Sequence, residues 1–329
     1  MTSAQRPARV LFFGSGAFGV PTLRAVSTTH RVVGVVSQPD RPAGRGGALT
    51  PTPVSQEVLA GAAGLGGVEL IRCEDVNAPA DRERIRAIDA DVWLVIAFGQ
   101  KLSPELLGGE AGRPAINLHA SLLPRWRGAA PINAAILAGD ARTGNSVITL
   151  AERMDAGLVL GQSERAIETS MTAGELHDLL ADDGPALVGR VIDSIMTRGV
   201  EGQRQDEALV TRARKLSRAD AWVDFGATAE ECRRRINGLS PWPGVTAGLL
   251  GKHLKLVRAD TQKTEGEPRE PGRFADPSTG AVWCGDGAIC RILEVQPAGG
   301  VVMSWAEFAR GGGRKVDGSM KLEAGRPTC

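Results

Sequence analysis

Short apolar runs alternate with stretches of helical character over the first 200 residues of the chain. The run Arg9–Phe13 is closed by glycines, and the β-branched run Val32–Val36 follows a helical stretch at Pro21–Val26. Such runs predict buried strands. Further strands are expected at Val68–Ile71, Val92–Ala97, Ala115–His119, Ser146–Leu150 and Gln162–Ile167, and further helices at Val54–Ala62, Asp81–Ile88 and Ala173–Ile195. This alternation predicts an α/β, Rossmann-like domain whose mostly parallel sheet has helices on both faces.

The pattern changes beyond residue 200. Glu201–Glu207 is polar and rich in Gly and Gln, which is typical of a linker. Strands are then expected at Val245–Leu249, Leu254–Val257, Gly272–Ala275, Val282–Trp283 and Ile289–Val295, and helices at Thr228–Ile236 and Ser304–Arg310. Short strands at this spacing predict a small OB-like β-barrel, a fold that often binds oligonucleotides. We therefore expect an α/β domain over 1–200, a linker over 201–215 and a barrel domain over 216–329, with no pattern in the tail after Gly311.

Composition and length narrow the class of protein. The 329 residues suit two domains, and 42% hydrophobic with 23% charged residues is ordinary for a globular enzyme. The five cysteines are scattered without a C-x-x-C pair, which favours reduced thiols over disulfides or a metal site. The apolar run near the N-terminus is too short for a signal peptide, and no stretch is long enough to span a membrane. We expect a cytoplasmic enzyme without a metal.

The formal net charge of +1 hides an asymmetry along the chain. Residues 1–210 hold 20 Lys and Arg against 24 Asp and Glu, whereas residues 211–329 hold 19 against 14. A basic C-terminal part indicates a polyanionic partner. Charge alone leaves a random fluctuation as an equally good explanation.

A glycine motif follows the first strand. Gly14, Gly16 and Gly19 fit the G-x-G-x-x-G pattern of dinucleotide-binding sites. That function needs an acidic residue at the end of the second strand, and the chain there reads Ser37-Gln38. The alternative is a tight strand-to-helix turn in which glycines permit close packing, and we favour it.

Two polar side chains mark the end of the strand Ala115–His119. Asn117 and His119 are two residues apart and share one face, while Leu118 faces the other. They lie at the carboxyl end of a strand, where open α/β sheets bind their ligands. A buried polar pair satisfied by backbone groups is the alternative. Downstream, Asp155 precedes Gly157 in a turn, from which it could face the pair across neighbouring strands; a plain turn without a role in the site is the alternative.

These residues carry a resemblance to a known family. His119–Pro124 reads His-Ala-Ser-Leu-Leu-Pro and is followed by Arg125–Pro131, Arg-Trp-Arg-Gly-Ala-Ala-Pro. With the later Asp155-x-Gly157, this pattern resembles the folate-dependent formyltransferases. The resemblance extends from Val10 to about Trp305. It implies a catalytic trio of Asn117, His119 and Asp155 and a co-substrate, 10-formyltetrahydrofolate.

The resemblance also implies where the folate lies. Its expected contacts are the loop Ile96, Ala97, Phe98, Gly99 and Gln100 and the loop Ser121, Leu122, Leu123 and Pro124. An amine that attacks a formyl carbonyl generates an oxyanion, which the Asn117 amide and a protonated His119 can stabilise. Asp155 can keep His119 charged and accept protons through water. The substrate supplies the nucleophile, so Ser121 needs no base partner.

The family divides by the acceptor of the formyl group. Enzymes that act on glycinamide ribonucleotide resemble a single domain of about 200 residues, so the length of this chain disfavours them. The loop Pro39–Pro53 resembles the insertion by which the methionyl-tRNA branch reaches the acceptor end of the tRNA. Gly47 and Ala48 stand where that branch commonly has lysines. A flexible surface loop is the alternative, and an amino sugar nucleotide is the competing acceptor.

The C-terminal part favours the tRNA branch. Ala213–Ser217 and Ile236–Gly244 resemble the start of the family's second domain, although Pro241-Trp242-Pro243 is shared with the sugar-nucleotide enzymes. Lysine and arginine contacts to phosphates would supply affinity for tRNA. The expected tRNA-binding residues are Arg41, Arg45, Arg214, Lys215, Lys252 and Lys255, with Arg212, Arg218 and Arg258 as further candidates; a plain solvated charge is the alternative for each residue of the C-terminal part. The expected partner is initiator methionyl-tRNA, and nothing in the sequence indicates an obligate protein partner.

Overall fold

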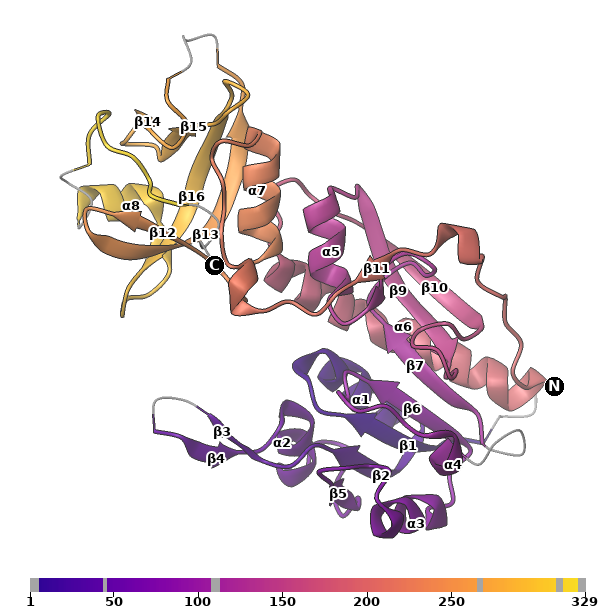
Figure 1. Cartoon of the computed structure of the whole chain (residues 1–329). Coiled ribbons are helices and arrows are strands. Elements are labelled where there is room, and N and C mark those ends of the chain that lie inside the picture. Colours follow the sequence, from indigo (N-terminus) through magenta and orange to yellow (C-terminus); the bar gives the residue numbers. More distant parts are fainter. Residues whose placement is uncertain (1–5, 44–45, 108–112, 265–268, 312–315, 325–329) are drawn as a thin grey trace. The chain divides into compact units, whose positions relative to one another are not determined.

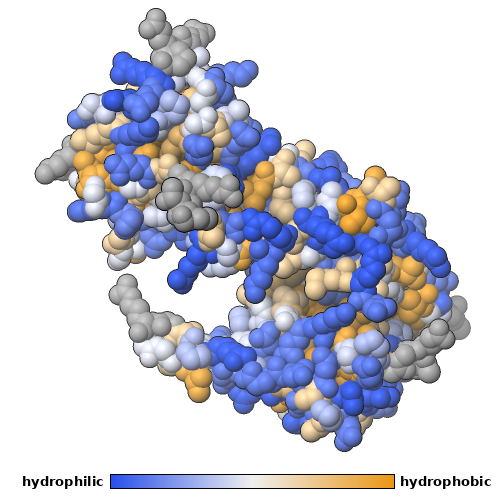
Figure 2. Space-filling view, viewed as in Figure 1, coloured by the Kyte–Doolittle hydropathy of each residue, from blue (hydrophilic) through white to orange (hydrophobic). Residues whose placement is uncertain are grey.

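The structure is a computed structural model that describes residues 6–43, 46–107, 113–264, 269–311 and 316–324 (Figure 1). The chain divides into two compact units. The first is Met1–Arg127, Gly144–Glu164 and Asp178–Thr211, and the second is Gly128–Thr143, Arg165–His177 and Arg212–Cys329. Hydrophilic residues cover most of the face of the molecule seen in Figure 2.

A seven-stranded sheet in the order β10-β9-β7-β6-β1-β2-β5 organises the first unit. Its strands are β1 (Arg9–Gly14), β2 (Arg31–Ser37), β5 (Leu70–Arg72), β6 (Val92–Ile96), β7 (Ala115–His119), β9 (Arg142–Thr149) and β10 (Val159–Ala166). β1 pairs in parallel with β2 and β6, as do β2 with β5 and β6 with β7, whereas β9 runs antiparallel to β7. The predicted mostly parallel sheet is confirmed.

Helices alternate with these strands. They are α1 (Val20–Thr29), α2 (Pro53–Leu59), α3 (Pro79–Ala87), α4 (Pro104–Leu107), α5 (Pro131–Ala138) and α6 (Ala173–Arg198), with a short 3-10 turn η1 at Ala17–Gly19. A proline opens α1, α2, α3 and α5, where its fixed φ suits a helix start and its missing N–H leaves no bond unmade. α5 has no counterpart among the elements expected from the sequence, although Gly139, with φ 76°, is also a regular helix stop.

The stretch Pro39–Pro53, expected to be a loop, contains two short strands. β3 (Arg41–Ala43) and β4 (Ala48–Thr50) form an antiparallel ribbon in which Arg41 pairs with Thr50. The expectation of a loop was therefore wrong for these residues, because three consecutive backbone pairs form despite the proline within β3. Arg45 and its neighbour Gly44 lie outside the described residues.

The glycine motif after β1 packs against the chain instead of leaving its amides open. The backbone N–H groups of Ser15 and Gly16 both donate to the carbonyl of Ala97, at 3.2 and 3.0 Å. A Cβ added at Gly16 would lie 3.1 Å from the Cβ of Ala97. Amides of this kind would bind the pyrophosphate in a dinucleotide site. Here they fix the loop that follows β6, which favours the tight-turn interpretation.

The second unit is an antiparallel sheet in the order β12-β13-β16-β15-β14, with β17 paired to β16. Its elements are α7 (Ala229–Gly238), β12 (Val245–Leu249), β13 (Lys252–Gln262), β14 (Phe274–Asp276), β15 (Ala281–Trp283), β16 (Ile289–Pro297), β17 (Met303–Ser304) and α8 (Trp305–Arg310). Thr228 and Glu231 close a reciprocal capping box at the start of α7. The rings of Phe274 and Trp305 lie 5.4 Å apart in the buried core.

The two edge strands of this sheet are joined by residues 320–323. Glu323 and Gly248 of β12 exchange two backbone hydrogen bonds of 2.7 and 2.9 Å, and the N–H of Phe274 in β14 donates to Met320. Leu322 between them is 1% exposed and belongs to the core. The tail, in which the sequence showed no pattern, therefore closes the sheet into a barrel. The expected OB-like barrel has its closing segment there.

The polar segment expected to be a linker is bonded to the first unit over residues 203–211. Gln203 and Val159 of β10 exchange two backbone hydrogen bonds of 2.8 and 2.9 Å. The segment includes a 3-10 turn, η3 (Glu207–Leu209), and β11 (Arg212–Ala213) follows and pairs with β8 (Arg127–Gly128); a further turn, η4, spans Arg218–Asp220. Polar composition at these positions thus reflects hydrogen bonds to neighbouring loops.

Buried cysteines occur in both units. Cys73, Cys232, Cys284 and Cys290 are free and buried, while Cys329 lies outside the described residues. Within the described ranges, no group of three or more potential ligands is arranged to hold a metal ion. No helix in those ranges combines the length and apolar character needed to span a bilayer.

Candidate active site

The site forms where the parallel strands end. Because β1, β2, β6 and β7 are parallel, their carboxyl ends lie along one edge of the sheet. Asn117 and His119 are on β7 at this edge. β7 pairs with β6 on one side and with β9 on the other. Asn117 is half-buried, and among the described residues its side chain has no hydrogen-bond partner. Its amide is therefore available to a ligand.

His119 lies between a carbonyl and a carboxylate. Its Nε2 is 2.9 Å from the carbonyl oxygen of Trp126, and its Nδ1 is 3.7 Å from Oδ1 of Asp155. A carbonyl only accepts, so Nε2 carries a hydrogen and donates it. Nδ1 is the remaining ring atom, and its distance from Asp155 exceeds that of a hydrogen bond. Both side chains are largely buried, with 7% and 13% exposed.

The backbone adopts disfavoured conformations on both sides of His119. Asp155 has φ 55° and Trp126 has φ 62°, in the left-handed region that costs a residue with a side chain roughly 1 kcal/mol or more. Asp155 lies in the turn between β9 and β10. Thr149, the last residue of β9, pairs with Ile116, so the turn must fold back toward the end of β7 to bring Asp155 to His119. The sequence-predicted trio therefore comes together.

The first predicted folate loop alternates between buried and exposed residues. Ile96 and Phe98 are buried, whereas Ala97, with φ 47°, and Gly99 are exposed. Gln38 donates a 2.8 Å hydrogen bond to the carbonyl of Phe98. Gln100 is half-buried, and its side chain bonds the backbone of Val76 and Cys73. Exposed backbone at a strand end is a surface that a flat heterocycle can contact, while Gln100 supports the loop from behind.

The second predicted folate loop is held by a small polar cluster. Ser146 on β9 donates to the carbonyl of Ser121 at 2.6 Å and accepts from the N–H of Leu123 at 3.0 Å. Ser121 and Leu123 are buried, so their side chains support the loop, whereas Leu122 and Pro124 are half-buried and remain accessible. Gln162 of β10 completes the cluster through Ser146 and the carbonyl of Leu123. Neither Ser146 nor Gln162 was singled out from sequence.

The predicted tRNA-binding residues differ in what they contact. Arg41 forms an exposed ion pair of 2.7 Å with Glu74. Arg214 forms a two-pronged pair with Asp220, which lowers the pKa of that carboxyl to about 2, chiefly through their hydrogen bond. Lys255 donates to the carbonyl of Pro241 at 2.5 Å.

Two of the predicted tRNA-binding side chains have neither an ion pair nor a hydrogen bond among the described residues. Lys215 and Lys252 are exposed, and neither side chain has an ion pair within the part of the chain that the structure describes. Of the further candidates, Arg258 is held between Glu175 and Glu294, so it serves the second unit's own packing. The two lysines are therefore available to phosphates, as are Arg212 and Arg218, whose exposed side chains also have no partner among the described residues.

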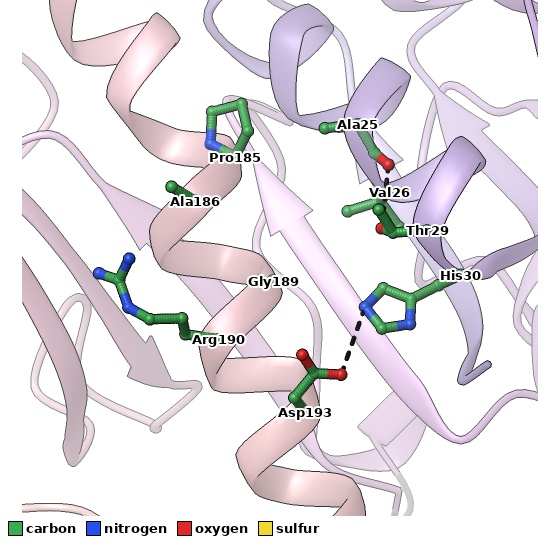
Figure 3. A pocket seen from close by; sticks show the side chains of 9 residues that line it. All are labelled: Ala25, Val26, Thr29, His30, Pro185, Ala186, Gly189, Arg190 and Asp193. Atoms are coloured by element: carbon green, nitrogen blue, oxygen red, sulfur yellow. Dashed lines mark hydrogen bonds and ion pairs between the residues drawn. The ribbon is translucent and has the colours of Figure 1, made fainter. Parts of the chain in front are cut away.

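A second histidine–aspartate pair lies in a groove of about 440 Å³ beside α1 and α6 (Figure 3). Nε2 of His30 is 4.0 Å from Oδ1 of Asp193, whose side chain is 63% exposed. Nδ1 of His30 is buried and has no hydrogen-bond partner among the residues that the structure describes. Arg190 lines the same groove and points away from His30. Neither His30 nor Asp193 belongs to a motif described above.

The chain belongs to the formyl transferase family. It matches the family's formyl transferase domain over residues 8–192 and its C-terminal domain over residues 215–313. Its relatives include the methionyl-tRNA formyltransferase of Acidiphilium cryptum, which is 42% identical over 92% of this chain and 96% of the relative. The methionyl-tRNA formyltransferase of Paracoccus denitrificans is 40% identical over 92% of this chain and 97% of its own length.

A solved structure shares the fold. The N-formyltransferase from Helicobacter canadensis, crystallised with folinic acid and dTDP-3-aminofucose, superposes with a TM-score of 0.66 and is 13% identical. The match covers 87% of this chain and 98% of that one. At this identity the likeness concerns the fold alone.

Proposed function

We propose that this chain transfers the formyl group of 10-formyltetrahydrofolate to the amino group of initiator methionyl-tRNA. The observation that carries the proposal is the Asn117 amide, which has no protein partner in the described chain and stands two residues from His119 on the same strand. Unpartnered donors at a strand end suit an oxyanion that forms during acyl transfer. The work of the enzyme on a tRNA places the reaction in the cytoplasm.

The first step forms a bond between the amine nitrogen and the formyl carbon. The carbonyl electrons move onto oxygen, and the Asn117 amide can donate to that oxyanion. His119 can donate from Nδ1, because Nε2 is committed to the Trp126 carbonyl. In the charged ring Nδ1 also carries a hydrogen, and at 3.7 Å from Asp155 this hydrogen is not used in a hydrogen bond to the carboxylate, so a substrate oxygen placed beside it can accept it.

The second step breaks the bond between the formyl carbon and the folate nitrogen. The attacking amine gives up one proton, and the departing folate nitrogen takes up one, so no net proton is gained or lost. Asp155, beside His119, can carry this proton between the two nitrogens through water. The carboxylate also stabilises a charged His119 while the oxyanion exists.

The acceptor assignment is supported by the relatives more than by the fold. Proteins named methionyl-tRNA formyltransferase are about 40% identical over nearly their whole length, whereas the solved sugar N-formyltransferase is 13% identical. The exposed Lys215 and Lys252 suit a phosphate backbone. An amino sugar nucleotide is the second candidate, and Arg41, the basic residue of the described ribbon strands β3 and β4, is the feature of the ribbon that favours tRNA over it.

The test is a formyl-transfer assay with the purified full chain and 10-formyltetrahydrofolate. Charged initiator tRNA, charged elongator tRNA and an amino sugar nucleotide are supplied as acceptors at matched concentrations. We expect formylmethionyl-tRNA with the initiator as the preferred acceptor. Transfer to the sugar nucleotide alone would overturn the acceptor assignment, and no transfer to any amine would overturn the activity.

A further inference from the structure

One side chain outside the trio, that of Gln205, is hydrogen-bonded to the chain segments on both sides of His119. The Nε2 amide of Gln205, in the segment 203–211, donates to the backbone carbonyls of Asp155 at 2.8 Å and Gly157 at 2.9 Å. Its Oε1 accepts from Nε of Arg127 at 2.9 Å. Both amide hydrogens and the carbonyl oxygen of Gln205 are therefore used at once.

These contacts hold the two groups that flank the catalytic histidine. Asp155 supplies the carboxylate opposite Nδ1, and Arg127 directly follows Trp126, whose carbonyl accepts from Nε2. Asp155 and Trp126 both have positive φ, so each needs support from outside its own turn. Gln205 is hydrogen-bonded directly to the turn that contains Asp155. It reaches the turn that contains Trp126 through Arg127, the next residue in the chain.

Arg127 makes the connection rigid because it is buried. Its side chain is 2% exposed, and it donates to Gln205 through Nε and to Glu207 through Nη2. The backbone around it is bonded as well, since the N–H groups of Trp126 and Arg127 donate to Thr211 at 2.9 and 3.0 Å. A buried guanidinium that loses one acceptor is left with an unsatisfied donor, which favours movement of the turn.

We propose that Gln205 is a positioning residue of the transfer reaction. It fixes the Asp155 and Trp126 turns relative to His119, and so sets which ring nitrogen of His119 carries the hydrogen and which meets the substrate. This inference rests on the proposed function for its kinetic consequence, whereas its consequence for the His119 ring does not depend on the acceptor. The side chain works through other residues and does not itself touch the reacting atoms.

Two substitutions distinguish the hydrogen bond that Gln205 accepts from Arg127 from the two that it donates to Asp155 and Gly157. Gln205→Met keeps the length of the side chain and removes all three hydrogen bonds. Gln205→Glu keeps an acceptor for Arg127 but replaces the donor to Asp155 and Gly157 with an oxygen, which repels their carbonyls. Gln203→Met is the matched control, because the Gln203 side chain is exposed and its backbone bonds persist in the variant.

The experiment measures kcat and KM for both substrates, the melting temperature, and the ring ¹⁵N shifts of His119. The chain has four histidines, so a His119→Gln variant assigns the signals. Both Gln205 variants should lower kcat by about 10- to 100-fold with little change in either KM, as small displacements of reacting groups do. The His119 ring should be hydrogen-bonded through Nε2–H in the wild type and sample both tautomers in Gln205→Met.

The results test the positioning role of Gln205 and the proposed formyl transfer separately. Wild-type kcat in Gln205→Glu, or an unchanged His119 ring in Gln205→Met, would overturn the positioning role. Equal losses in the Gln203→Met control would also overturn it, since the effect would then belong to the segment as a whole. If the wild type fails to formylate methionyl-tRNA, the proposed function fails, and the ring shifts still test Gln205.

Discussion

The first unit places one histidine–aspartate pair at the candidate site and another, of similar separation, beside α1 and α6, and the two pairs differ in their surroundings. His119 and Asp155 are 3.7 Å apart, and His30 and Asp193 are 4.0 Å apart. His119 has a carbonyl on its second nitrogen, whereas the second nitrogen of His30 is buried and has no hydrogen-bond partner among the described residues. Asp155 is largely buried, whereas Asp193 is mostly exposed.

The comparison shows that a histidine–aspartate pair does not by itself identify a catalytic site. A fixed second nitrogen selects one tautomer, and only then does the first nitrogen have a defined role. The pair of His119 and Asp155 also has the Asn117 amide of β7 beside it, without a protein partner in the described residues. The groove beside α1 and α6 also has donors in its lining, but Arg190 points away from His30 (Figure 3) and the Thr29 hydroxyl donates to the carbonyl of Ala25.

Replacement of the trio is the strongest test of this contrast. We expect Asn117→Ala, His119→Ala and Asp155→Ala each to lower kcat at least roughly 100-fold, because each removes a group that acts on the transition state. Steady-state transfer to methionyl-tRNA measures the effect. His30→Ala is the matched histidine control and should keep wild-type turnover even if its melting temperature falls. Equal losses in His119→Ala and His30→Ala would erase the distinction between the pairs.

Loss of the exposed lysines should act on binding and leave the chemical step intact. We expect Lys215→Ala and Lys252→Ala each to raise KM for tRNA and to reduce the slope of log affinity against log salt by about one, since each removes a phosphate contact. kcat at saturating tRNA should stay at the wild-type value. Lys252→Arg keeps the charge and should keep the slope. A slope unchanged in both alanine variants would remove these lysines from the interface.

The Arg214–Asp220 pair should contribute to the stability of the second unit. The folded-state pKa of Asp220 is lowered to about 2, so its contribution is present above the unfolded value near pH 4 and is lost as the pH falls toward 2. Because Arg214 is 71% exposed, we expect less than about 1 kcal/mol. Melting of wild type and Asp220→Asn at pH 7 and pH 3 measures it, and the difference between the two proteins should shrink at the lower pH.

The smallest effect is expected at the ribbon. Glu74→Gln releases Arg41 from its exposed pair, so KM for tRNA should fall slightly, by no more than about two-fold given the weakness of such pairs. Glu69→Gln is the control, because Glu69 forms a similar exposed pair with Arg84. A rise in KM for Glu74→Gln would mean that the ion pair presents Arg41 to the RNA in the required position.

The parts of the fold that the sequence predicts well are those in which the residue types follow a regular pattern. The runs Arg9–Phe13 and Val92–Ala97 differ by one residue from β1 and β6, because buried parallel strands are continuous β-branched and aliphatic sequences. Asn117 and His119 were placed on one face by the two-residue period of a strand. The family resemblance supplied Asp155, since nothing local shows that its turn folds back to β7.

The features that sequence missed depend on single hydrogen bonds between distant segments. Gln205 lies in a stretch without apolar period, and its polar neighbours resemble those of a free linker. Ser146 and Gln162 look like ordinary strand residues until the loop Ser121–Pro124 is placed against them. Side-chain bonds to a backbone carbonyl have no sequence period and no required spacing, so they become visible only in three dimensions.

The closing segment of the barrel has a consequence for the order in which the second unit folds. Gly248 and Glu323 pair although they are 75 positions apart in the chain, whereas β12 and β13 are joined by a tight turn at Leu250–Gly251. The hairpin can therefore form on a local timescale, while closure must wait for a long loop to be ordered. A barrel caught before closure would expose two strand edges and the side chain of Leu322. Its vulnerability to aggregation would then be set by how fast the tail docks.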